Sequence, residues 1–367
     1  MAIFVTLFIY WSNTSRMNKV SSWIMLFLAS STLIVLATFR GNNVGHDQVW
    51  YVNTFLSKTT LNLDLARVLG LKSTEPLWLV YLYVLRSITS NSRVFLFVNA
   101  IVYTIPLVFI LKELWKDTSN YAFMPLFIID YVYKFSAIRS GFAEAFVLFA
   151  ILSLKKGYYV KAIMLCLIGA MFHYTAFIGA LFILFYYVQT TTIKGLSHIK
   201  RTIFVLSITF AVMLVSFALV YILRGTKYTY YLSQSGTIIG NAFVIVLFII
   251  LISIDLQKTD IRYSIAIYGA LFSGIITPAV IILGAYRLPD FFTLLRLISW
   301  TLVSEFCIRS SSAYISSNLT SRIVCSSKSN TRINFVSKIV PYFAMVIYLL
   351  YKLSRVANNS SIMPYIL

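Results

Sequence analysis

Three arginines of this chain stand beside apolar segments, in positions where they could bind an anionic group. Arg40 follows one apolar block, Arg139 begins another, and Arg287 lies in a Pro-containing break between two more. The topology predicted below brings all three to one side of a membrane. A guanidinium keeps its charge at physiological pH and can bind two phosphate oxygens at once. The three arginines together therefore predict a site for a pyrophosphate group.

An acidic residue lies deep in the apolar segment that Arg139 begins. This residue is Glu144, and a charge inside an apolar span is costly enough to make it a candidate functional residue. Five residues of α-helix turn through about 500°, so the two side chains point roughly 140° apart. We therefore expect each to find its partner elsewhere. The alternatives are a structural hydrogen bond between helices for Glu144 and contact with lipid headgroups for Arg139.

A histidine stands among apolar residues in the stretch Phe172–Thr175. An imidazole changes its protonation state near neutral pH, so His173 is a candidate base, although a lone histidine in such a setting also serves as a structural hydrogen-bonding residue. His46, His173 and His198 lack the i, i+4 spacing of metal ligands, and we expect no metal site. The sequence has no Gly-rich phosphate loop and no Gly-x-Ser-x-Gly elbow, so neither nucleotide binding of the soluble type nor serine hydrolysis is indicated.

The elements that position these residues are membrane spans. Apolar residues make up 59% of the 367 positions and charged residues only 11%, against about 25% in soluble proteins. The net charge of +20 would suggest nucleic acid in a soluble protein, but the basic residues lie mostly in short loops, where they set topology, and we expect no nucleic acid partner. We predict an all-α, polytopic membrane protein with 10–12 transmembrane helices, in which residues 1–367 form one integral membrane domain. Its clearest apolar blocks are Trp23–Phe39, Val94–Leu111, Thr202–Leu223, Ala242–Ile254 and Ile265–Gly284.

The basic loops predict which side each span faces. The positive-inside rule assigns the turns Lys112–Lys116 and Lys155–Lys161 to the cytoplasm, together with the later basic loops. The alternation holds if Tyr158–Val188 crosses twice, as a hairpin that turns near His173; the alternative is a single tilted span. The outer face then receives a long segment after the second span, residues 40–93. Within it, the short apolar stretch after Pro76 predicts a re-entrant or interfacial helix, with an ordinary solvated loop as the alternative.

The order of these motifs resembles that of the EpsG family of Wzy-type O-antigen and exopolysaccharide polymerases. The resemblance covers most of the chain. In the N-terminal half it rests on Arg40-Gly41, Gly45-x-Asp47, Tyr51, Glu75-Pro76, Arg139-x-x-x-Ala143 and Phe172-His173, and further on it rests on Arg287 before an aromatic pair and Met363-Pro364-Tyr365. The chain departs from the family pattern at Ser140, where glutamine is common, and at Leu288-Pro289, which interrupts the stretch before the aromatic pair.

The resemblance implies a glycosyltransferase at the periplasmic face of the bacterial inner membrane. It would transfer a growing glycan from undecaprenyl pyrophosphate onto a lipid-linked repeat unit. Such chemistry needs cations at the departing pyrophosphate and a base at the acceptor hydroxyl. The resemblance implies the first role for Arg139, Arg287 and Arg40, the second for Asp47 or His173 with Glu144 behind them, and substrate binding for Glu75 and Tyr51. It implies no cofactor, and its partners are the lipid-linked oligosaccharide, membrane lipid and a co-polymerase that regulates chain length.

Two other functions stay open at this stage. A flippase or transporter for lipid-linked oligosaccharides would also be polytopic and basic, and Glu144 is the residue that most favours it. A membrane acyltransferase that modifies surface glycans would use His173 as its base, but no acid stands near that histidine in the sequence.

Overall fold

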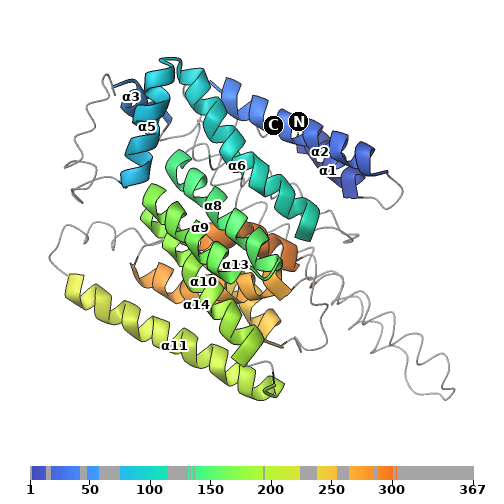
Figure 1. Ribbon diagram of the computed structural model, residues 1–367. Coiled ribbons are helices and arrows are strands. Elements are labelled where there is room, and N and C mark those ends of the chain that lie inside the picture. Colours follow the sequence, from blue (N-terminus) through green and yellow to red (C-terminus); the bar gives the residue numbers. More distant parts are fainter. Residues whose placement is uncertain are drawn as a thin grey trace. The chain divides into compact units, whose positions relative to one another are not determined.

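A computed structural model of the chain describes its helical regions. The described residues are 2–13, 18–41, 48–57, 75–114, 131–132, 134, 137–192, 195–223, 238–253, 264–283, 288–300 and 303. All the regular elements among them are helices (Figure 1). Five of these helices are long and apolar enough to cross a membrane. The prediction of an all-α, polytopic membrane protein is confirmed, whereas the count of 10–12 spans and the single domain stay predictions.

The chain forms two compact units, which are described separately. The first comprises residues 1–117, 127–195 and 356–367, and the second residues 118–126 and 196–355. In the first unit the helices are α1 (Ala2–Asn13), α2 (Lys19–Phe39), α3 (Gln48–Leu56), α5 (Pro76–Ile88), α6 (Ser92–Leu114), α8 (Ile138–Lys155), α9 (Tyr159–Phe172), η1 (Tyr174–Ala176), α10 (Phe177–Tyr187) and η2 (Val188–Thr192). In the second they are α11 (His198–Leu223), α13 (Ile238–Ser253), α14 (Ser264–Leu283) and η5 (Leu288–Phe292), followed by helical residues 293–300.

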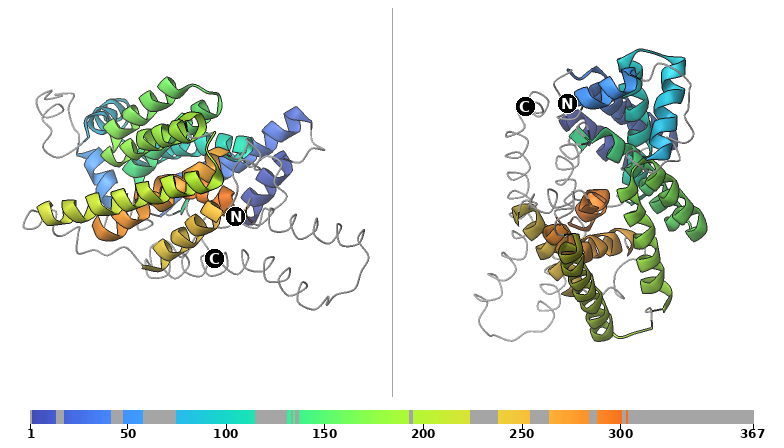
Figure 2. Two further views of the ribbon diagram at one scale, coloured as in Figure 1. Left: turned by 90° about the horizontal axis from the view of Figure 1, so that it is seen from below. Right: turned by 90° about the vertical axis from the view of Figure 1, so that its left-hand side faces the viewer.

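The second unit is built around α14. Both α11 and α13 pack against this helix, and Figure 2 shows α11 running beside it. Helix α14 is 20 residues long and is one of the candidate spans.

The predicted hairpin is present in the first unit. Helix α9 ends at Phe172, His173 leaves the helical conformation, and α10 returns along α9. The two helices are antiparallel, since a Cβ atom on Gly169 would lie 3.4 Å from that of Ala176 and one on Gly179 would lie 2.8 Å from Cys166 Sγ. The predicted turn is confirmed and His173 lies at its tip, whereas the crossing of a membrane by both helices stays a prediction.

Helix α5 matches the helix predicted after Pro76. Proline occupies its first turn, where its missing N–H costs nothing, and Glu75 is the N-cap residue. Its 13 residues span about 20 Å, less than the roughly 30 Å of a bilayer core. The helix is therefore too short to cross, and its re-entrant or interfacial placement stays a prediction.

Basic residues gather at both ends of the helices of the first unit. At the end where α6 and α8 stop, Lys155 Nζ lies 2.5 Å from Glu113 Oε2. At the other end Arg93, in the first turn of α6, donates to the carbonyl of Arg40, which follows α2. We call these the lysine end and the arginine end. The lysine end carries Lys19, Lys112, Lys155, Lys156 and Lys161; the arginine end carries Arg40, Arg93, Arg139 and His173.

The close approach of α9 and α10 makes a prediction about stability. We expect Gly179→Val to destabilise the protein by about 1–3 kcal/mol, because the added methyl groups would overlap Cys166 and Val147. The matched control is Gly195→Val, since no heavy atom lies within 4 Å of a Cβ at that position. Thermal unfolding in detergent measures both, and equal melting temperatures for the two variants would contradict the packing described here.

Candidate functional site

One carboxylate joins two of the predicted site residues at the arginine end. Glu75 Oε2 lies 2.7 Å from Arg139 Nη1, and Glu75 Oε1 lies 2.8 Å from His173 Nδ1. The Glu75 side chain is 5% exposed, that of His173 15% and that of Arg139 22%. We call these three residues the Glu75 cluster. Its outer members are accessible while its centre is buried.

Helix ends position the three side chains. Glu75 caps α5, Arg139 is the second residue of α8, and His173 stands in the break between α9 and η1. Aromatic rings pack around these helix ends: Phe142 contacts Trp78, with ring centroids 6.1 Å apart, and Phe172, at 4.7 Å. The Glu75 carboxylate is itself buried, and its two oxygens are directed toward Arg139 and His173.

The arrangement can perform acid–base chemistry. A carboxylate on Nδ1 fixes the orientation of an imidazole and stabilises its protonated form, which leaves Nε2 to accept a proton from a substrate. This is the geometry of a general base with an orienting acid.

The arrangement can also bind an anion. Arg139 uses Nη1 for Glu75, while its Nε is buried without a hydrogen-bond partner. A guanidinium has five N–H donors, so Arg139 keeps donors for a second, anionic partner. The Thr175 hydroxyl, two residues after His173, is likewise buried without a hydrogen-bond partner.

The charge state of Glu75 follows from its neighbours. Burial opposes ionisation of this carboxyl group, but the hydrogen bond from His173 and the positive charge of Arg139 outweigh it. They hold the pKa of Glu75 below its ordinary value of 4.5. Glu75 is therefore a carboxylate at neutral pH, which suits its contacts with a guanidinium and an imidazole.

Glu144, the third candidate base, is part of a different pair. Its Oε2 lies 2.5 Å from Lys134 Nζ, and the two side chains are 2% and 5% exposed. As expected from their angular separation, Glu144 and Arg139 find different partners. The described contacts of Glu144 fit the structural alternative that the sequence left open.

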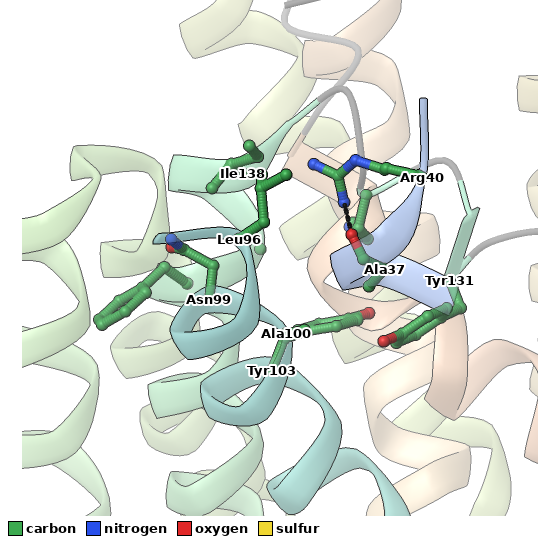
Figure 3. A pocket seen from close by; sticks show the side chains of 11 residues that line it. Ala37, Arg40, Leu96, Asn99, Ala100, Tyr103, Tyr131 and Ile138 are labelled. Atoms are coloured by element: carbon green, nitrogen blue, oxygen red, sulfur yellow. Dashed lines mark hydrogen bonds between the residues drawn. The ribbon is translucent and has the colours of Figure 1, made fainter. Parts of the chain in front are cut away.

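Arg40 lines a small polar pocket at the arginine end (Figure 3). It donates from Nε to Gln48 Oε1 at 2.5 Å and from Nη1 to the Ala37 carbonyl at 3.1 Å. The Asn99 Oδ1 atom is buried without a partner, so a hydroxyl group of water or sugar would satisfy it. The polar residues of the pocket are Arg40, Asn99, Tyr103, Tyr131 and Lys134.

Three predicted site residues remain, and the structure describes one of them, Tyr51. Tyr51 is buried in α3, where its ring meets that of Trp78 edge to face at 5.9 Å. Tyr51 therefore packs against Trp78, which lies three positions after Glu75 in the first turn of α5. Asp47 and Arg287 lie outside the described residues. No three His, Cys, Asp or Glu side chains of the described part of the chain group as metal ligands would.

Sequence reasoning missed two features of this end of the molecule. Lys134 carried no signal, because it stands in an ordinary polar–apolar stretch before α8. The acid that serves His173 is 98 positions away from it, so a search for a nearby acid could not find it. The absence of an adjacent acid was an argument against an acyltransferase, and the contact between Glu75 and His173 removes that argument.

Comparison with known protein families shows which family this chain belongs to. The model of the EpsG family matches residues 23–367, nearly the whole chain. The chain belongs to the EpsG family. This family consists of Wzy-like polymerases, and membership supports a role of the chain in polymerising surface polysaccharide. Searches of curated proteins and of solved structures found no match. In this EpsG-family chain the Glu75 cluster unites Glu75-Pro76, Arg139 and Phe172-His173, three of the motifs on which the resemblance rests.

The lowered pKa of Glu75 makes a prediction about acid stability. A carboxyl group with a depressed pKa in the folded state stabilises the fold above its unfolded pKa, and this contribution is lost as the pH falls through the folded value. We expect the melting temperature of the wild type to exceed that of Glu75→Gln at neutral pH and the gap to close below about pH 4.5. Thermal unfolding of both proteins from pH 7 to about pH 3 measures it. A difference in melting temperature that stays constant over this pH range would show that the charge of Glu75 does not stabilise the fold.

Proposed function

We propose that this protein polymerises surface polysaccharide by moving a growing glycan from undecaprenyl pyrophosphate to the terminal sugar of a lipid-linked repeat unit. The observation that carries the proposal is the Glu75 cluster, which joins a proton acceptor and a phosphate ligand through one carboxylate. A glycosyl transfer from a lipid pyrophosphate requires both groups at the same place. Family membership supports the polymerase class, and the donor is part of the proposal.

The cluster assigns a role to each group in this reaction. The acceptor hydroxyl oxygen attacks the anomeric carbon of the donor sugar, and His173 Nε2 takes the hydroxyl proton. The bond between that carbon and the pyrophosphate oxygen breaks, and its electron pair leaves with the pyrophosphate. Arg139 stabilises the negative charge on the leaving group, and Glu75 stabilises the imidazolium. The products are a glycosidic bond and undecaprenyl pyrophosphate, so no cofactor is consumed.

The distribution of charge supports a periplasmic site in the bacterial inner membrane. Cytoplasmic loops carry an excess of lysine and arginine in short connections. The turn between α8 and α9 contains Lys155 and Lys156, and Lys161 follows it in α9. This turn is at the opposite end of the helices from the Glu75 cluster. With the lysine end in the cytoplasm, the proposal has the Glu75 cluster at the outer face.

Other predicted residues keep their roles within the proposal. Arg40 and Arg287 are further ligands for pyrophosphate, and Asp47 is the alternative base. Tyr51 acts through Trp78 and α5. The partners in this scheme are the lipid-linked oligosaccharide, the surrounding lipid and a chain-length co-polymerase.

The two alternative functions fit the molecule less well. The argument for a flippase rested on Glu144, and this residue is paired with Lys134 in the interior. An acyltransferase would use the contact between His173 and Glu75, but the family to which the chain belongs polymerises glycans.

The proposal predicts the polysaccharide phenotype of two variants. We expect His173→Ala and Arg139→Ala, expressed at wild-type level in cells that lack the native protein, to abolish the ladder of long chains and leave single repeat units. The loss of a base is worth about 10²–10⁴ in rate, enough to remove polymer from a gel. His198→Ala is the matched histidine control, because His198 begins α11 in the other unit, and its ladder should be normal.

The same gel separates the competing functions. Single units capped on the exported lipid indicate a polymerase that has lost activity. Lipid-linked units retained on the cytoplasmic side would indicate transport, and a normal ladder with an altered acyl content would indicate modification. Either of these outcomes contradicts the proposed function.

A further inference from the structure

A buried arginine in the second unit has no acidic partner among the residues that the structure describes. Arg296, in the helical residues 293–300, is 7% exposed. It donates from Nη2 to Thr293 Oγ1 at 2.6 Å and from Nη1 to Ser273 Oγ at 3.3 Å. Neither Asp290 nor any other acid that the structure describes forms an ion pair with it. Two neutral hydroxyl groups are therefore its protein partners.

The position of Arg296 makes an unbalanced charge costly. Ser273 is the tenth of the 20 residues of α14, a candidate span, so the guanidinium lies opposite the middle of that helix. A charge at such a depth is expensive unless it is paired, and it marks a functional position by default. In the first unit, by comparison, Lys134 is paired with Glu144 and Arg139 with Glu75.

The groups around Arg296 form a set of donors that suits phosphate. Its guanidinium can bind two phosphate oxygens, and the Ser273 and Thr293 hydroxyls are 0% and 2% exposed. Both hydroxyls can turn to donate to an anion that binds beside the guanidinium. The set is fixed by two packed segments, since α14 contacts η5 directly before the helix of Arg296.

We propose that Arg296, Ser273 and Thr293 form an anion site in the second unit that binds a phosphate group of a polyprenyl pyrophosphate. The inference rests on the proposed function, whose donor and acceptor each carry a pyrophosphate. The proposed function assigns Arg139, with Arg40 and Arg287, to the departing pyrophosphate, and it assigns no cation to the pyrophosphate of the second substrate. The site of Arg296 supplies one and neutralises its own buried charge when the substrate binds.

Binding of inorganic pyrophosphate to the full chain in lipid nanodiscs tests this site. We expect the wild type to bind at two sites and Arg296→Gln and Arg139→Gln to lose one each, with affinity reduced about tenfold or more at the altered site. Ser299→Ala is the matched control, because Ser299 is fully buried in the same helix and bonds only to the Leu295 carbonyl. A short-chain polyprenyl pyrophosphate should displace inorganic pyrophosphate from the site that Arg296→Gln removes.

Stability without ligand separates a binding arginine from a structural one. If Arg296 is kept for a ligand, Arg296→Gln should melt at or above the wild-type temperature in the absence of pyrophosphate, because an unpaired buried charge has been removed. Pyrophosphate should raise the melting temperature of the wild type more than that of the variant. A marked loss of stability without ligand would show a structural role and overturn the inference.

The remaining outcomes distinguish this inference from the proposed function. If Arg296→Gln keeps both sites, or polyprenyl pyrophosphate fails to displace the inorganic ion, the inference is wrong, while the polysaccharide ladder still decides the function. If the variant loses its site but the ladder is normal in His173→Ala and Arg139→Ala cells, the anion site stands and the proposed function fails.

Discussion

The arrangement of the arginine end depends on one buried carboxylate. An ionised carboxyl group loses its hydration when it is buried, and it stays charged only if its oxygens meet donors or cations. Glu75 meets this requirement with Arg139 on one oxygen and His173 on the other. The same contacts link the starts of α5 and α8 to the tip of the hairpin. The contacts that keep Glu75 ionised are therefore the same contacts that bring the three site residues together.

The hairpin of α9 and α10 makes the contact between Glu75 and His173 possible, because a helix ends just before His173. If residues 158–188 formed one continuous helix, the direction of the side chain at position 173 would be fixed by its position on that helix. The break after Phe172 frees His173 to adopt an extended backbone, with φ of −157°. Two glycines allow the helices of the hairpin to pack closely: Gly169 leaves room for the Ala143 carbonyl beside α9, and Gly179 leaves room for the Cys166 side chain beside α10.

Much of the fold was predictable because it depends on local patterns. Apolar length indicated the spans, Pro76 indicated the start of α5, and basic residues indicated that Tyr158–Val188 turns back near His173. The angle between positions 139 and 144 on a helix was sufficient to show that Arg139 and Glu144 have different partners. The pairing of Glu75 with His173 was not predictable, since these residues are separated by 98 positions and meet only through tertiary packing. The Lys134–Glu144 pair was missed for a related reason, because a lysine before a helix resembles an ordinary topology signal.

The tight contact between α8, α9 and α10 limits where this protein can vary. Where a glycine meets its neighbours at van der Waals distance or closer, a larger side chain has no room, so Gly169 and Gly179 cannot vary freely. Variation is instead tolerated on the outward faces of the same helices, where side chains such as Met164 and Leu184 are exposed.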